Sequence, residues 1–214
     1  MQLIFDGPSN GPLFVFVHGA GAPLTSDFME KVATGLAKQG IRVARFNFNY
    51  MQQRIETGSR RPPERAPHLI KQFMDVIQKL NQPMVIGGKS MGGRMATLLA
   101  AQEPAELLQN VKGIACLGYP FHPQGKPEKL RTEHLPAIKQ PVAIIQGSRD
   151  KLGDKEEVEG YSLPEHFQWC WLEDGDHDFK PRVKSGLTQQ QHIQSSIDFL
   201  ITYIRSCCTL HLEK

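Results

Sequence analysis

A serine flanked by glycines lies at the centre of Gly88-Lys89-Ser90-Met91-Gly92, a segment with the spacing G-x-S-x-G. A serine hydroxyl acts as a nucleophile only when a base takes its proton and the backbone holds it clear of neighbouring groups. The apolar run before Ser90 and the helical pattern after it predict a sharp strand-to-helix turn, where bulky flanking side chains would collide with adjacent backbone. The segment therefore predicts that Ser90 is a nucleophile.

Histidine is the side chain best suited to take the serine proton at neutral pH. Among the eight histidines, His177 lies in a polar loop between the predicted last strand and the predicted last helix. Functional groups in open α/β sheets gather in such loops, at the carboxyl ends of strands. His166 and His192 are interpreted as surface histidines, so His177 is the predicted base.

A carboxylate must hold that histidine in the right tautomer. Asp150 follows another predicted strand, in Gln146-Gly147-Ser148-Arg149-Asp150, and it precedes His177 in the chain. Asp154 is the alternative acid. Three further acids in the His177 loop are interpreted as solvated charges: Asp174, Asp176 and Asp178.

Two backbone amides are candidates for stabilising an oxyanion on the substrate. The Met91 amide lies at the start of the predicted helix after Ser90, where the helix dipole is positive. The glycine-rich turn His18-Gly19-Ala20-Gly21 follows an earlier buried strand, and the second amide is assigned to Ala20. His18 is interpreted as bracing this turn, and the alternative is that the turn is only a tight connection.

These residues need a scaffold, and short apolar runs alternate with helical patterns along the whole chain. The alternation predicts one α/β domain over residues 1–214, with a mostly parallel sheet of about six strands flanked by helices. The expected strands are 13–17, 41–48, 83–87, 111–117, 141–146 and 167–172, with 3–5 as a candidate edge strand. The expected helices lie between residues 27 and 40, 70–80, 91–101 and 193–204. The polar stretch from 49 to 67 is predicted to be a loop.

Composition excludes several classes of partner. A formal charge of +3, spread evenly, gives no field for nucleic acid, and no run reaches the roughly 20 apolar residues of a membrane span. The four cysteines lack metal or redox spacing and suggest a reduced, cytoplasmic setting. The expected partner is a small molecule, with no nucleic acid and no membrane, and the sequence leaves the oligomeric state open.

The chain resembles the α/β-hydrolase superfamily over nearly its whole length, specifically a short, lidless branch similar to dienelactone hydrolases. The segments RFNFNYM, TGSRRPP, GGKSMGGRMA and GYPFHPQGKPEKLR are also similar to small bacterial hydrolases related to testis-expressed and NSL-complex α/β-hydrolase-like proteins. Dienelactone hydrolases use a cysteine where this chain has Ser90, so their substrate is not carried over. The segment 121–140 is too short for a helical lid, which argues against a lipase that works at oil interfaces.

The resemblance implies a serine hydrolase with Ser90 as nucleophile, Asp150 as acid, His177 as base, and the Ala20 and Met91 amides as oxyanion donors. It implies cleavage of a small ester or thioester, with no cofactor and no metal. Amide or peptide hydrolysis uses the same parts and remains an alternative. A non-catalytic binding protein of the same fold is a second alternative, because a fold can persist without its chemistry.

Two sets of residues are candidates for contacting the substrate. A basic rim that attracts an anion is one hypothesis, with solvated loop charges as the alternative. Its members are Arg54, Arg60, Arg61, Arg65, Lys89 and Arg94, among which Arg60 and Arg61 are named as substrate-binding residues. Tyr119 and Phe121 follow a predicted strand and are expected to line an acyl pocket, with core packing as the alternative.

Overall fold

A computed structural model describes residues 2–59 and 61–209 of the 214-residue chain. The strands are β1 (Leu3–Asp6), β2 (Leu13–Val17), β3 (Arg42–Phe46), β4 (Met84–Lys89), β5 (Val111–Leu117), β6 (Val142–Gly147) and β7 (Gln168–Leu172). The α-helices are α1 (Asp27–Lys38), α2 (Asn49–Thr57), α3 (Ala66–Leu80), α4 (Met91–Gln102), α5 (Lys155–Glu159) and α6 (Gln189–Thr209). Short 3₁₀ turns are η1 (Ala105–Leu108), η2 (Leu135–Ala137) and η3 (Val183–Ser185).

The seven strands form one sheet in the order β1-β3-β2-β4-β5-β6-β7. The pairs from β3 to β7 are parallel, and only β1 pairs antiparallel, at the edge against β3. This confirms the predicted mostly parallel α/β sheet and the predicted edge strand. The parallel strands place all their carboxyl ends at one edge of the sheet, where the loops that carry Ser90, Asp150 and His177 begin.

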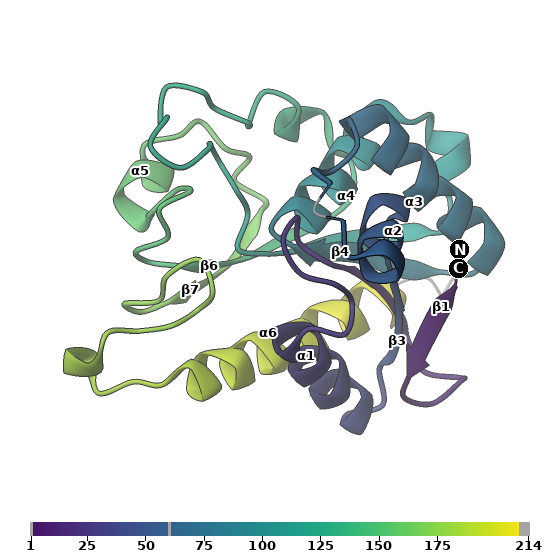
Figure 1. Ribbon diagram of the computed structural model, residues 1–214, viewed down its shortest axis with the longest axis horizontal. Helices are drawn as coiled ribbons and strands as arrows, with labels where there is room; N and C mark the ends of the chain where they lie inside the picture. The colour runs from purple at the N-terminus through teal and green to yellow at the C-terminus, as the bar shows by residue number, and fades with distance from the viewer. Residues whose placement is uncertain (1, 60, 210–214) are drawn as a thin grey trace.

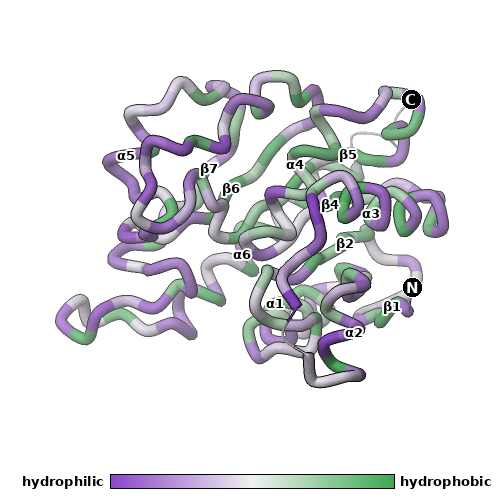
Figure 2. Tube along the Cα trace, turned by 45° about the horizontal axis from the view of Figure 1, so that its top comes forward, coloured by the Kyte–Doolittle hydropathy of each residue, from purple (hydrophilic) through white to green (hydrophobic). Residues whose placement is uncertain are grey.

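Helices cover both faces of the sheet, α1 and α6 on one face and α2, α3 and α4 on the other (Figure 1). Alternate residues of β2 pack into two separate cores: Leu13, Val15 and Val17 join the α3 and α4 side, while Phe14 and Phe16 join the α1 and α6 side. A strand buried on both faces has no polar alternation. The hydropathy colouring accordingly runs green through the strands and purple over much of the outer chain (Figure 2).

One predicted loop is wrong, because residues 49–57 of the polar stretch form helix α2. Only Tyr50 and Met51 of this helix are buried, so its sequence lacks the apolar stripe that reveals a longer helix. Its remaining residues include Gln, Glu and Arg, which favour helix at exposed positions. The helix ends at Gly58, whose φ of 68° suits a left-handed cap.

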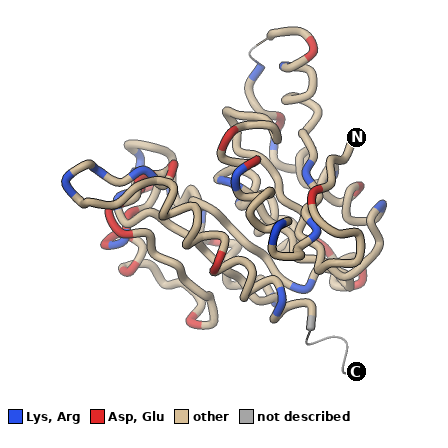
Figure 3. Tube along the Cα trace, turned by 90° about the horizontal axis from the view of Figure 1, so that it is seen from below, with Lys and Arg blue, Asp and Glu red and all other residues tan. Residues whose placement is uncertain are grey.

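The connection from β5 to β6 contains only the 3₁₀ turn η2 and no α-helix, so residues 121–140 form no helical lid. Lysine, arginine and acidic side chains are interspersed over the described chain (Figure 3). No helix among the described residues is both long and apolar enough to cross a bilayer.

Candidate active site

Ser90 lies in the sharp turn between β4 and α4, with φ of 51° and ψ of −112°. A non-glycine residue with positive φ is strained, and such strain persists only where the surroundings enforce it. Here the enforcement is steric: a Cβ on Gly88 would come within 2.4 Å of the Val17 carbonyl oxygen, and one on Gly92 within 2.5 Å of the same atom. Both glycines of the motif therefore let strand β2 approach the turn closely.

The side chain of His177 lies between Ser90 and Asp150. Its Nε2 is 2.9 Å from Ser90 Oγ, and its Nδ1 is 2.7 Å from Asp150 Oδ2. A carboxylate only accepts, so Nδ1 carries the proton and Nε2 is free to accept from the serine hydroxyl. The structure thus brings together the three side chains singled out in the sequence, in the order and tautomer that proton transfer from Ser90 requires.

Asp150 is fully buried after the end of β6. Its Oδ2 also accepts from Gln146 Nε2 at 3.1 Å, and its Oδ1 accepts from the Leu152 amide at 2.9 Å. These bonds fix the carboxylate against His177 and compensate its burial. Asp154, the alternative acid, instead caps α5 by accepting from the Glu157 amide at 3.0 Å.

The loop that carries His177 is held by an ionic network that the sequence did not reveal. Asp174, interpreted as a solvated charge, is buried and accepts from the Arg182 side chain and its amide. Arg149 Nε lies 2.9 Å from its Oδ1. Hydrogen bonds from Arg182 lower the pKa of Asp174 to about 2, so the carboxylate stays charged over the ordinary pH range.

Lys89 connects the turn at Ser90 to the loop that carries His177. Its Nζ donates to the His177 carbonyl oxygen at 2.7 Å and lies 3.9 Å from Asp178 Oδ1. The side chain is buried, and its ammonium faces the ring of Phe28 at 5.6 Å. Burial lowers the pKa of Lys89 to about 8 despite the nearby carboxylates. Its position directly before Ser90 was the only signal in the sequence.

The glycine-rich turn after β2 is braced as the sequence predicts. His18 is fully buried, its Nε2 accepts from the Phe48 amide at 3.1 Å, and its Nδ1 donates to the Gly19 carbonyl at 2.6 Å. Burial lowers the pKa of His18 to about 4, so the ring is neutral at pH 7. Tyr50 adds a bond from its hydroxyl to the Ala20 carbonyl at 3.1 Å.

Two hollows meet at Ser90. The first, which we call the His177 hollow, has a volume of about 440 Å³ and is lined by His177, Lys89 and Phe28, among others. The second, which we call the Arg94 hollow, has a volume of about 290 Å³ and is lined by Met91, Arg94 and others. Ser90 and Ala20 border both hollows. A molecule bound across Ser90 would thus have one part on each side.

The residues expected to contact substrate are mostly placed elsewhere. Tyr119 and Phe121 are fully buried in the core, with ring centroids 4.8 Å apart, so they do not line an acyl pocket as expected. Arg61 is exposed and lines neither hollow at Ser90, and Arg60 lies outside the described residues. Arg131, which sequence reasoning missed, lines the Arg94 hollow. Of the described members of the predicted basic rim, Lys89 lines the His177 hollow and Arg94 lines the Arg94 hollow.

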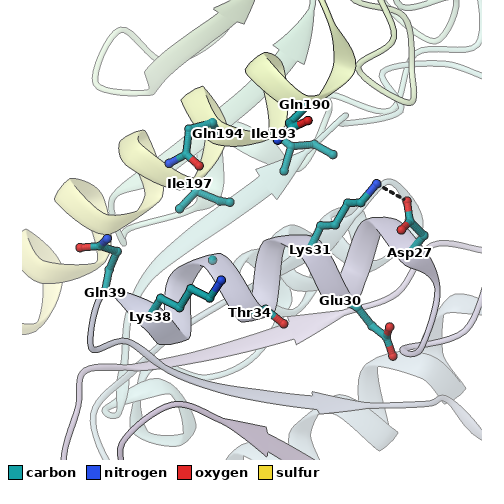
Figure 4. Close-up of a pocket in the computed structure, with 11 residues that line it drawn as sticks. Asp27, Glu30, Lys31, Thr34, Lys38, Gln39, Gln190, Ile193, Gln194 and Ile197 are labelled. Atoms are coloured by element: carbon teal, nitrogen blue, oxygen red, sulfur yellow. Dashed lines mark ion pairs between the residues drawn. The ribbon is translucent and has the colours of Figure 1, made fainter.

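Two other features are set apart from this site. His192, interpreted as a surface histidine, is buried, and its Nδ1 donates to the Phe179 carbonyl at 2.9 Å. A groove of about 520 Å³ lies between α1 and α6 (Figure 4). Asp27 and Lys31 in this groove already pair at 2.8 Å, and neither Ser90 nor His177 lines it. Neither feature contributes a side chain to the hydrogen bonds among Ser90, His177 and Asp150.

Comparison with known proteins identifies the family. Residues 10–205 match a family described as alpha/beta hydrolase domain, and the chain belongs to this family. The fold is the α/β-hydrolase fold, and it is similar to those of esterases and lipases.

Solved structures share this fold at low sequence identity. An alpha-beta serine hydrolase homologue from Coxiella burnetii matches with a TM-score of 0.68 and 13% identity, over 94% of this chain and 90% of that one. Est1E from Butyrivibrio proteoclasticus, whose structure is also known with ferulic acid bound, matches with a TM-score of 0.66 and 14% identity, over 94% of this chain and 93% of that one. A monoacylglycerol lipase from Paleococcus ferrophilus matches with a TM-score of 0.68 and 14% identity, over 94% of this chain and 99% of that one. At such identities the likeness concerns the fold alone.

Proposed function

We propose that this protein is a serine hydrolase that cleaves a small ester or thioester through an acyl-enzyme on Ser90. The observation that carries the proposal is the hydrogen-bonded line from Ser90 Oγ to His177 Nε2 and from His177 Nδ1 to Asp150 Oδ2. A line of this kind activates a serine hydroxyl at neutral pH. Its position between two hollows supports a substrate that spans the serine.

In the first half of the reaction, Ser90 Oγ attacks the carbonyl carbon while its proton passes to His177 Nε2. The tetrahedral oxyanion accepts from the amides of Ala20 and Met91, each of which contributes roughly 3 kcal/mol in comparable sites. The bond to the leaving oxygen or sulfur then breaks, and His177 gives that atom the proton. Asp150 stays ionised and stabilises the imidazolium in between.

In the second half, a water molecule takes the place of the leaving group and His177 removes its proton. The water oxygen bonds to the acyl carbon, the bond to Ser90 Oγ breaks, and the proton returns to the serine. The products are a free acid and an alcohol or thiol. These steps use only groups of the chain and one water molecule, so no cofactor or metal is part of the proposal.

A small, lidless member of the family is the finer assignment that we propose. The absence of an α-helix in residues 121–140 supports open access to Ser90, and the volumes of the two hollows support a compact substrate. Est1E, a structural neighbour, has been seen with ferulic acid, a small organic acid.

A fluorophosphonate probe tests the proposal, because it reacts covalently with activated serines. We expect it to label the wild type and Ser195→Ala, which removes an exposed serine of α6, and to leave Ser90→Ala unlabelled. Hydrolysis of p-nitrophenyl acetate should follow the same pattern. A wild-type protein that neither reacts with the probe nor cleaves the ester would contradict the proposal and favour a non-catalytic binding protein.

A further inference from the structure

The two hollows at Ser90 differ in the part of the substrate that they can take. The leaving group must receive a proton from His177 Nε2, so it has to lie on the side that His177 lines. The Arg94 hollow is not lined by His177, and it borders Met91, whose amide faces the carbonyl oxygen in the proposed reaction. The acyl group therefore belongs in the Arg94 hollow.

Two guanidinium groups line this acyl side, Arg94 and Arg131. Neither forms an ion pair with any carboxylate among the described residues. Arg94 Nε is buried and has no hydrogen-bond partner there. A buried donor without a partner is costly, and native proteins keep such groups mainly where a ligand or water completes them.

The positive charges are close enough to affect each other. Burial and the charge of Arg94 lower the pKa of Arg131, and the same two causes, burial first, lower the pKa of His134. One carboxylate, Glu64, lines the same hollow, but its Oε2 already accepts from Gln72 Nε2 at 2.7 Å. Two guanidiniums against one carboxylate leave the hollow with a net positive charge.

The backbone holds both arginines in place without using their side chains. Arg94 lies in the first turn of α4, where its amide donates to the Ser90 carbonyl at 3.0 Å. The Arg131 amide donates to the Phe121 carbonyl at 2.7 Å, and its carbonyl accepts from Tyr119 Oη at 2.8 Å. The buried Tyr119 and Phe121 thus position Arg131, although neither lines the hollow. A site built before the ligand arrives loses less entropy on binding.

We propose that Arg94 and Arg131 bind a carboxylate at the far end of a short acyl chain, so that the preferred substrates are half-esters or half-thioesters of small dicarboxylic acids. Guanidinium groups match a carboxylate in geometry and charge. The volume of about 290 Å³ suits a short chain. This inference rests on the proposed hydrolase function, because it assigns the acyl side from the direction of proton transfer.

The test compares kcat/KM for monoethyl glutarate and ethyl pentanoate, which differ only by a carboxylate in place of a methyl group, measured by titration of the released acid. The wild type should prefer the charged ester. Arg131→Gln and Arg94→Gln should each lower the ratio of kcat/KM for the charged ester to kcat/KM for the neutral ester, by about 10-fold or more. Arg131→Lys, which keeps the charge, should lower it less. Arg42→Gln, at the start of β3 and remote from both hollows, should leave the ratio unchanged.

A second pair of esters separates the two sides of the site. O-acetylglycolate differs from ethyl acetate by a carboxylate on the leaving group, so Arg131→Gln should leave the ratio of kcat/KM for these two esters unchanged. The assignment would be overturned if Arg131→Gln changed the kcat/KM ratio of O-acetylglycolate to ethyl acetate but left that of monoethyl glutarate to ethyl pentanoate unchanged. A wild type that prefers ethyl pentanoate, and whose preference Arg131→Gln does not alter, would also overturn it. Fluorophosphonate labelling of each variant keeps these results apart from a failure of the hydrolase proposal, which would abolish labelling of the wild type as well.

Discussion

The turn that carries Ser90 and the loops that carry Asp150 and His177 are held in place by different kinds of interaction. The turn is fixed by close backbone packing, since Gly88 and Gly92 both press against the Val17 carbonyl. The His177 loop is fixed by side-chain contacts, of Asp174 with Arg182 within the loop and of Lys89 with the His177 carbonyl. The position of Ser90 therefore depends on sterics, whereas the position of His177 depends on charge and hydrogen bonding.

The largest effect is expected from a substitution that disturbs the close packing around the Ser90 turn. Gly88→Ala places a Cβ about 2.4 Å from the Val17 carbonyl oxygen, so strand β2 or the turn must shift. We expect a loss of more than about 4 kcal/mol in the free energy of unfolding, measured by urea denaturation. Gly21→Ala is the matched control, because a Cβ there meets no atom within 4 Å. Equal stability of the two variants would show that the close packing is not what holds the turn.

Asp150 is the most direct place to change the hydrogen bonds that orient His177. Asp150→Asn should keep the fold but favour the wrong tautomer of His177, because the amide can donate to Nδ1. We expect kcat to fall by about 10⁴-fold, as in other Ser-His-Asp enzymes, with near-normal stability. Asp154→Asn, which alters the cap of α5, serves as the control and should keep most of the activity. If the two variants lost activity equally, Asp150 would not be the orienting acid.

Lys89 joins the two regions, so its replacement should have a smaller effect on rate and a visible effect on stability. In Lys89→Met the His177 carbonyl loses its donor, and we expect kcat to fall by about 10-fold. The pKa of Lys89 is lowered to about 8, below that of the same lysine in the unfolded chain. Holding the buried charge at neutral pH thus costs up to about 3 kcal/mol, so the variant should be the more stable protein at pH 7.

The pH dependence of this stability difference tests whether Lys89 is held as a buried cation. Between the folded pKa of about 8 and the higher unfolded pKa, the unfolded chain binds more protons, so wild-type stability rises with pH relative to Lys89→Met. The advantage of the variant should therefore shrink as pH increases from 8 towards 10, in urea titrations at each pH. Lys71→Met, which changes an exposed lysine, should show no such trend. An advantage that stays constant with pH would mean that Lys89 is not held as a buried cation.

The same contrast explains which parts could be predicted from the sequence. The turn at Ser90 is specified by neighbouring residues, so its motif and the flanking patterns were enough to locate it. Helix α2 was missed because only one narrow face of it is buried. The roles of Tyr119, Arg131 and Asp174 depend on contacts between segments that have no local pattern, such as the bond from Tyr119 Oη to the Arg131 carbonyl. Polarity alone misplaced Asp174 at the surface, since only the folded chain brings Arg149 and Arg182 to it.

The most direct test of the account is to trap the acyl group. Protein mixed with p-nitrophenyl acetate, quenched in acid and digested, should carry one acetyl group on the peptide that contains Ser90. Release of p-nitrophenol should begin with a burst of one equivalent per active site. Ser90→Ala should show neither the modified peptide nor the burst. Turnover by Ser90→Ala at the wild-type rate, or acetylation of a different residue on the reaction timescale, would contradict the central claim that His177 and Asp150 activate Ser90.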